Sequence, residues 1–190
     1  ICDDQKWLLM VDEVQSGFCR TGKWFGYQHS GIIPDVVTVA KALGNGVPIG
    51  ACLTNEMSST ILTPGSHGST FGGNFLSTTV GLKVLDIMKE QHLCENARFM
   101  GLYIEQELKN KLMGYSVVKD IRCKGLMIGI ELNIKCLNLV EEALKNKLVI
   151  NVTKENTIRM LPPLIIGKVE IDIIVDVLYK IIGEIKYEKS

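Results

Sequence analysis

An aspartate and a lysine each follow a short apolar run of the kind that forms a buried strand. Asp12 comes directly after the run 7–11, and Lys41 comes directly after the run 36–40. Continuous apolar runs with β-branched residues are typical of central parallel strands, which are buried on both faces. Because ligands of open α/β sheets bind at the carboxyl ends of the strands, we expect this carboxylate and this amine to face one crevice.

A carboxylate and an amine in one crevice suit the chemistry of pyridoxal phosphate. A lysine amine in a partly apolar site can form a Schiff base with the cofactor aldehyde. An aspartate beside the pyridine nitrogen keeps the ring protonated, so that the ring accepts the electrons of a substrate carbanion. Taken alone, Asp12 is explained equally well as a carboxylate that caps a turn. Its combination with Lys41 favours the cofactor site.

Two further polar residues have a possible role in binding. Thr70 lies in the glycine-rich segment 65–74, where hydroxyl and N–H groups that lead toward a helix can form an anion site. A simple turn hydroxyl is the alternative. Arg159 lies on an otherwise apolar run, and its planar guanidinium matches a carboxylate with two hydrogen bonds. An internal salt bridge is the alternative for Arg159.

The composition is that of a globular protein with balanced charge. The 190 residues contain 21 basic and 21 acidic side chains and are 46% hydrophobic. This balance argues against nucleic acid as a partner, and no apolar run reaches the roughly 18 residues that a membrane span needs. Six cysteines and three histidines are too scattered for a zinc site or a disulfide framework. We therefore expect free thiols, no metal, no membrane partner and a cytoplasmic location.

The spacing of apolar residues predicts two domains. Residues 1–92 are expected to form the later part of a large parallel-sheet domain with a connecting helix from Ser77, and residues 93–190 a small α+β domain. The elements predicted for the second part are a helix over 93–108, a strand over 126–130, a helix near 139–144, strands at 148–152 and 157–161, and a final helix over 170–184.

Several long motifs occur in the order found in one enzyme family. They are LLMVDEVQSGFCRTGKWFGYQHSGIIPDVVTVAKALGNGVPIGA, HGSTFGGN and IRMLPPL. With these motifs, essentially the whole chain resembles the class III (ornithine-type) pyridoxal phosphate aminotransferases. The resemblance implies an α/β fold of type I, the aspartate-aminotransferase-like fold. It also implies transfer of the δ-amino group of N-acetylornithine to 2-oxoglutarate in arginine biosynthesis, with ornithine as the alternative amino donor.

The resemblance also implies a role for five residues. Lys41 of the A-K-A-L-G motif would be the Schiff-base lysine, and Asp12 of D-E-V-Q would bond the pyridine nitrogen. Gln15 of the same motif would contact the ring hydroxyl. Thr70 of H-G-S-T would donate to the cofactor phosphate of the other subunit in a homodimer. Arg159, which precedes L-P-P-L, would bind the substrate α-carboxylate.

Three residues depart from the pattern of that family. Cys19 and Asn45 stand where the family commonly has glycine, and Phe75 replaces a proline. Asparagine tolerates a positive φ better than most residues, whereas cysteine does not. We therefore expect the loop around Cys19 to differ from that of the family.

The first residues raise a question about the extent of the chain. The sequence starts at Ile1 and enters an apolar run within six residues, so we expect an N-terminal half to be missing. One hypothesis is that the chain is the C-terminal half of a working aminotransferase. The other is a short non-catalytic chain that dimerises or binds a partner, which predicts exposed apolar surface where strands lack neighbours.

Overall fold

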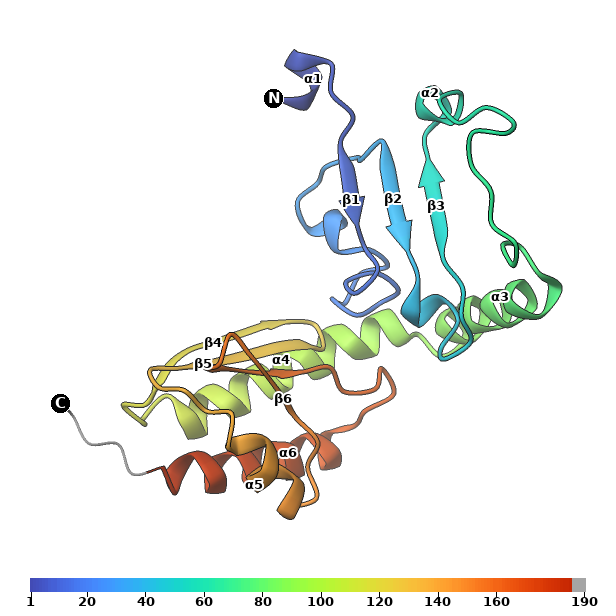
Figure 1. Ribbon diagram of the computed structural model, residues 1–190. Coiled ribbons are helices and arrows are strands. Elements are labelled where there is room, and N and C mark those ends of the chain that lie inside the picture. Colours follow the sequence, from blue (N-terminus) through green and yellow to red (C-terminus); the bar gives the residue numbers. More distant parts are fainter. Residues whose placement is uncertain (186–190) are drawn as a thin grey trace. The chain divides into compact units, whose positions relative to one another are not determined.

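The computed structural model describes residues 1–185, and it divides the chain into two compact units, Ile1–Cys94 and Glu95–Ser190 (Figure 1). The first unit contains α1 (Cys2–Gln5), β1 (Met10–Asp12), a 3-10 helix (Gly26–His29), β2 (Val36–Val39), a second 3-10 helix (Lys41–Leu43), β3 (Ala51–Thr54), α2 (Glu56–Ser59) and α3 (Phe75–Glu90). The helix α4 (Leu93–Leu112) begins at the end of the first unit. The second unit continues with β4 (Val118–Lys124), β5 (Met127–Leu132), α5 (Leu139–Lys145), β6 (Asn151–Thr153), β7 (Thr157–Met160) and α6 (Lys168–Gly183).

The sheet of the first unit has β2 at its centre. The strand β1 pairs with β2 in parallel, and β3 pairs with β2 in the antiparallel sense (Figure 1). Asp35 fixes the start of β2, because its carboxylate accepts hydrogen bonds from the backbone N–H of Leu9 at 2.8 Å and from the Asn55 side chain at 2.7 Å. These bonds set the parallel register, in which Asp12 lies opposite Thr38.

The prediction of two strands buried on both faces is right for β2 and wrong for β1. Val36, Val37 and Val39 are buried, whereas Trp7 and Met10 are 62% and 64% exposed. Among the described residues β1 has only β2 as a neighbour, so one of its edges lacks a partner. The strand β3 was not predicted, because its four residues are all exposed and show no apolar alternation.

The helix α3 begins at Phe75, two residues before the predicted start. Asn74 caps this helix, since its side-chain oxygen accepts a hydrogen bond from the backbone N–H of Ser77 at 2.9 Å. The buried Ser77 hydroxyl donates to the carbonyl of Pro48 at 3.0 Å. These contacts join the start of α3 to the loop that follows the second 3-10 helix.

The second unit is a four-stranded antiparallel sheet packed with three helices. Its strand order is β4-β5-β7-β6. One apolar core joins α4, α5 and α6 to the sheet, with Ile104, Leu108, Ile128, Ile158 and Leu178 fully or almost fully buried. The prediction of α+β structure is confirmed, including the predicted strands within 126–130 and 157–161 and the last helix. The strand predicted at 148–152 is displaced and forms at Asn151–Thr153.

The strand β4 escaped the sequence analysis for a physical reason. Its register shifts between Val118 and Asp120, and its buried residues, Val118 and Ile121, are therefore three positions apart. Such a bulge breaks the alternation that identifies a strand and imitates the spacing of a helix.

The expectation of free thiols throughout is wrong. Cys19 and Cys94 form a disulfide within the first unit, and their α-carbons are 4.4 Å apart. The sequence did not reveal this pair, because the two cysteines are 75 positions apart and only the fold brings them together. Cys2, Cys52, Cys123 and Cys136 are free.

Residues 1–185 lack two further features, a metal-ligating cluster and a membrane-spanning helix. No group of three or more metal-ligating side chains occurs in this part of the chain. Within the same residues, no helix combines the length and the apolar character that crossing a bilayer requires.

Glu131 on β5 is the centre of the clearest charge cluster of the second unit. Its carboxylate accepts hydrogen bonds from Lys119 Nζ at 2.6 Å and from Arg122 at 2.8 Å. These bonds lower the pKa of Glu131 to about 2. The folded state therefore keeps this carboxylate ionised at pH values where the unfolded chain binds a proton.

This pKa predicts an acid-dependent loss of stability. The contribution of Glu131 is fully present above about pH 4.5 and falls as the pH drops toward 2, because the unfolded state binds more protons in that window. We expect the urea midpoint of Glu131→Gln to change less between about pH 6 and about pH 3 than that of the parent chain. Glu184→Gln is the control, since Glu184 is exposed and forms no ion pair among residues 1–185. A parent and a Glu131→Gln variant with the same pH dependence would contradict the prediction.

Candidate active site

Asp12 and Lys41 lie at the same end of the first sheet, where the two parallel strands finish. The parallel strands β1 and β2 end at Asp12 and Val39, and Lys41 begins the 3-10 helix that directly follows β2 (Figure 1). Gln15 lies in the exposed turn after β1. The topology thus brings three of the five predicted site residues to the carboxyl end of the parallel pair, as expected from the sequence.

Lys41 has an unusual backbone conformation. Its φ is 41°, in the left-handed region that side-chain-bearing residues rarely adopt. Its carbonyl accepts hydrogen bonds from the N–H groups of Gly44 and Asn45, both at 3.1 Å. A strained residue of this kind costs roughly 1–3 kcal/mol and occurs preferentially at active sites.

Gly44 and Asn45 support the turn in different ways. A β-carbon on Gly44 would overlap the carbonyl oxygen of Val47 and would come within 2.7 Å of a methyl group of Ile49, so only glycine fits. Asn45 has a φ of 45°, and Gly46 follows with 112°. Asn45 thus has a positive φ, which asparagine tolerates better than most residues.

The Asp12 carboxylate is exposed and has one local partner. Its Oδ1 accepts a hydrogen bond from the backbone N–H of Val14 at 2.9 Å. This contact is the turn-capping interaction that the sequence left open as an alternative. It occupies one carboxylate oxygen, and the structure assigns no hydrogen bond to the other.

Glu13 is a positioning residue that the sequence analysis missed. Its side chain is 1% exposed, and its carboxylate accepts hydrogen bonds from the Ser16 hydroxyl at 2.6 Å, the Gly26 N–H at 2.9 Å and the Tyr27 N–H at 2.7 Å. Its own N–H donates to the carbonyl of Thr38 and so extends the β1–β2 ladder. The sequence offered one signal for this role, a second acidic residue directly after the strand. If one of two adjacent carboxylates is buried, the following loop has to supply its hydrogen-bond donors.

The loop 16–26 runs from this carboxylate through Cys19. Phe18 and Cys19 have φ values of 54° and 67°, so both are left-handed. Cysteine tolerates a positive φ poorly, and the disulfide to Cys94 and complete burial hold Cys19 in this conformation. Burial also lowers the pKa of the neighbouring Arg20 from its ordinary value.

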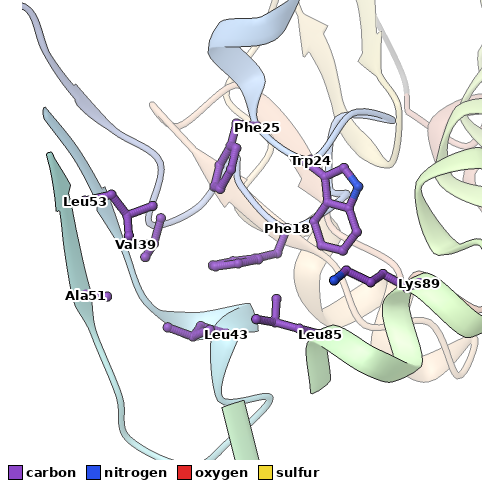
Figure 2. Close-up of a pocket in the computed structure, with 9 residues that line it drawn as sticks. All are labelled: Phe18, Trp24, Phe25, Val39, Leu43, Ala51, Leu53, Leu85 and Lys89. Carbon is purple, nitrogen blue, oxygen red and sulfur yellow. The ribbon is translucent and has the colours of Figure 1, made fainter. Parts of the chain in front are cut away.

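The same loop forms the aromatic wall of a pocket of about 310 Å³ (Figure 2). Phe18, Trp24 and Phe25 come from the loop, and Leu85 and Lys89 come from α3. The rings of Phe18 and Phe25 contact each other at a centroid distance of 5.7 Å. The conformation of the loop therefore determines the shape of this pocket.

Thr70 and Arg159 belong to other segments than Lys41, with Thr70 in the first unit and Arg159 in the second. Thr70 lies in the exposed segment 60–74 before α3. Arg159 lies on β7 of the second unit, between Gly129 of β5 and Asn151 of β6, and lines a cavity of about 320 Å³. Arg122 and Lys124 line the same cavity, so it has a cationic wall. No ion pair holds Arg159 among residues 1–185, which contradicts the alternative of an internal salt bridge within that part of the chain.

Replacement of Glu13 tests its positioning role. In Glu13→Gln, an amide NH₂ replaces a carboxylate oxygen that accepts hydrogen bonds, which leaves at least one buried donor without an acceptor. We expect the first unit to lose about 1–3 kcal/mol of stability, measured as a lower urea midpoint. Glu90→Gln is the matched control, because Glu90 is exposed at the end of α3. Equal midpoints for the two variants would show that Glu13 does not hold the loop.

Comparison with known proteins gives a consistent result for almost the whole chain. Residues 1–182 match the family described as Aminotransferase class-III. The chain is 48% identical to the acetylornithine aminotransferase of Nitrosomonas europaea over 92% of this chain and 44% of the relative. It is 46% identical to the enzyme of the same name from Methanothermobacter thermautotrophicus over 94% of this chain and 46% of the relative. The chain thus spans about half the length of these curated relatives.

Solved structures show the same relationship in three dimensions. The acetylornithine aminotransferase of Elizabethkingia anophelis is similar with a TM-score of 0.91 and 33% identity, over 97% of this chain and 50% of that one. The ornithine aminotransferase of Toxoplasma gondii has a TM-score of 0.91 and 32% identity, over 96% and 44%. The fold is therefore the corresponding part of a type I pyridoxal phosphate-dependent transferase. On sequence and structure together, the chain belongs to the class III aminotransferase family.

Proposed function

We propose that this chain carries the lysine-bearing part of a pyridoxal phosphate-dependent aminotransferase. The observation that carries the proposal is the position of Lys41, with its left-handed backbone, beside Asp12 at the carboxyl ends of two parallel strands. Family membership supports the same reaction class.

The residues at this edge fit the groups of pyridoxal phosphate. Asp12 is an exposed carboxylate with one oxygen not assigned a hydrogen bond, as a partner of a protonated ring nitrogen requires. Gln15 offers an exposed amide for the ring hydroxyl, and Lys41 offers an exposed amine for the aldehyde. Thr70 would supply its hydroxyl to the phosphate from the other subunit. When bound, pyridoxal phosphate supplies an aldehyde and a cationic ring that withdraws electrons from the reacting carbon.

Lys41 has two tasks in this proposal. Its Nζ would hold pyridoxal phosphate through the aldehyde when the cofactor is bound. Once free of the cofactor, the same amine would hold and move the proton of the reacting substrate carbon, which is general base and general acid catalysis by one group. Asp12 keeps the ring nitrogen protonated throughout, because a negative charge next to that nitrogen favours its charged form.

Arg159 orients the substrate in this proposal. Its guanidinium can donate two parallel hydrogen bonds to an α-carboxylate. The cavity around Arg159 also contains Lys124 and Arg122, although Asp120 and Glu131 already bind Arg122. A cationic wall favours substrates with a carboxylate, and both the amino donor and the 2-oxo acid of this reaction class carry one.

We infer that N-acetylornithine is the amino donor and 2-oxoglutarate the acceptor, which would assign the protein to arginine biosynthesis. The curated relatives named above are acetylornithine aminotransferases at 46% to 48% identity. Ornithine is the second candidate donor, because an ornithine aminotransferase structure is equally similar in fold.

We also propose that the working form is a homodimer in the cytoplasm. Exposed apolar side chains next to Thr70 support an interface, since Phe71 is 82% exposed, Phe75 91% and Leu76 71%. Contiguous exposed apolar surface is typical of sites that another protein surface covers.

Reductive labelling tests the assignment of Lys41. Treatment of the chain with a low concentration of pyridoxal phosphate and then borohydride should attach the cofactor to Lys41, as located by peptide mapping. Lys41→Arg should abolish this labelling, because the guanidinium does not react with the aldehyde under these conditions. Lys23→Arg is the matched control and should label like the parent, since Lys23 is exposed and its amine donates to the carbonyl of Gln28. Labelling that is spread over several lysines, or that persists in Lys41→Arg, would overturn the assignment.

Steady-state kinetics test the amino donor. For the protein expressed from its full coding sequence, kcat/KM should be higher for N-acetylornithine than for ornithine, with 2-oxoglutarate as the acceptor. A higher value for ornithine would overturn the inferred substrate and leave the reaction class intact.

Arg159→Lys should lower kcat/KM for both donors by roughly tenfold or more, because an ammonium cannot make the bidentate contact.

A further inference from the structure

The disulfide Cys19–Cys94 joins a strained loop to the start of a long helix. Cys19 is completely buried in the loop 16–26, whereas Cys94 is partly exposed in the first turn of α4. The α-carbon distance of 4.4 Å lies within the range of disulfides, at its short end. Both sulfur atoms belong to the first unit.

Noncovalent contacts also constrain the loop: the N–H of Gly22 donates to the carbonyl of Cys19 at 2.9 Å, and the Glu13 carboxylate holds the N–H of Gly26 at 2.9 Å. Phe18 and Cys19 are two consecutive left-handed residues, and neither residue type favours that conformation. The N–H of Cys19 donates to the carbonyl of Trp24 at 3.4 Å, which is a long hydrogen bond. The bond to Cys94 adds a covalent link between this part of the loop and the start of α4.

We propose that Cys19 and Cys94 form a reversible thiol–disulfide exchange site that is entered at Cys94 and that fixes the conformation of the loop 16–26. The partner class is a low-molecular-weight thiol and its disulfide. In oxidation, the Cys94 thiolate attacks a disulfide RSSR and releases RS⁻. The Cys19 thiolate then attacks the mixed disulfide at Cys94, closes the Cys19–Cys94 bond and releases a second RS⁻. The two protein protons end on the released thiols, so that two protein thiols and one RSSR give one protein disulfide and two RSH.

Exposure determines which sulfur reacts first. An external thiol or disulfide can reach the partly exposed Cys94, whereas Cys19 has no accessible surface. Cys123 and Cys136 compete poorly, because burial raises the pKa of both thiols, that of Cys123 to about 12. Cys52 is exposed and reacts with small disulfides, but it is a free cysteine and gives only a mixed disulfide.

The exchange has a structural consequence at the aromatic pocket. Phe18, Trp24 and Phe25 of the loop form its wall (Figure 2). Reduction removes the link at Cys19, so the strained backbone relaxes and the wall loses its fixed position. The loop also begins directly after Gln15, which ties the state of the cysteine pair to the edge that carries the candidate active site. The proposal itself does not depend on catalytic activity.

Thiol mapping of the purified chain tests the existence and the position of the site. After equilibration with oxidised glutathione, unfolding and alkylation, we expect a peptide crosslink between Cys19 and Cys94 and a glutathione adduct at Cys52. Excess reduced glutathione should remove the crosslink, and renewed oxidation should restore it. In Cys19→Ser, glutathione should remain attached to Cys94, and in Cys94→Ser it should not attach to Cys19.

Loop order is measured separately by trypsin cleavage after Lys23, which is exposed in the loop. Reduction should accelerate this cleavage by roughly fivefold or more, because cleavage requires local opening. Cys52→Ser is the matched control and should keep the full redox dependence. Cys19→Gly lacks the link to Cys94 and should therefore be cleaved at the fast rate with and without reductant, although glycine adopts a φ of 67° without strain. The variant Trp7→Phe leaves Trp24 as the only tryptophan. In this variant, reduction of the Cys19–Cys94 bond should shift the fluorescence emission of Trp24 to longer wavelength.

Three results would overturn the proposal. The first is six alkylated cysteines after equilibration with oxidised glutathione. The second is a crosslink that joins other cysteines, or glutathione on Cys19 in the Cys94→Ser variant. The third is a cleavage rate and a Trp24 emission that do not change on reduction of a mapped Cys19–Cys94 bond.

Discussion

The buried carboxylate of Glu13 is the constraint on which the first unit depends. An unpaired charge in this position would cost several kcal/mol, so the surrounding backbone has to supply donors. The N–H groups of Gly26 and Tyr27 and the Ser16 hydroxyl do so at 2.6 to 2.9 Å, and they can do so only if the loop 16–26 folds back under the end of β1. Glycine at position 26 lets the backbone approach the Glu13 carboxylate, because a β-carbon there would come within 3.2 Å of a carboxylate oxygen. One side chain thereby fixes the loop, while its backbone N–H fixes the β1–β2 ladder that aligns Asp12 with Lys41.

Strained backbone is concentrated around the same strand ends. Phe18 and Cys19 lie in the loop after β1, and Lys41 and Asn45 lie in the turn after β2, all with positive φ. Each such residue costs on the order of 1–2 kcal/mol and must be held by its surroundings. Close packing at Gly44 holds the turn after β2, and the Glu13 contacts and the disulfide hold the loop after β1. Both chain segments are therefore set before a ligand arrives, which reduces the conformational entropy that binding must offset.

Sequence reasoning succeeded where a single local pattern determines the structure. The uninterrupted apolar residues of β2 and the apolar stripe of α6 identified both elements, and the two strand-like runs correctly placed Asp12 and Lys41 after the ends of paired parallel strands. It failed where the decisive contact is long-range. Burial of β1 depends on a neighbour that residues 1–185 do not contain, the bulge in β4 removed its alternation, and the Cys19–Cys94 pair spans 75 positions. Glu13 was missed for a related reason, since its role is visible only once the loop 13 positions away returns to it.

The exposed apolar side chains of the first unit bear on how the proposed site would reach its active form. Trp7, Met10, Phe71 and Phe75 are each more than 60% exposed, and they flank the two segments that carry Asp12 and Thr70. Burial of such side chains contributes roughly 1.5–3 kcal/mol each, so a covered surface would stabilise the first unit by an amount comparable to the stability of a small domain. Association and completion of the site are then one equilibrium. If a second copy of the chain covers this surface, the partner that supplies Thr70 also stabilises the sheet whose strand ends carry Asp12 and Lys41. The affinity for cofactor then rises with protein concentration.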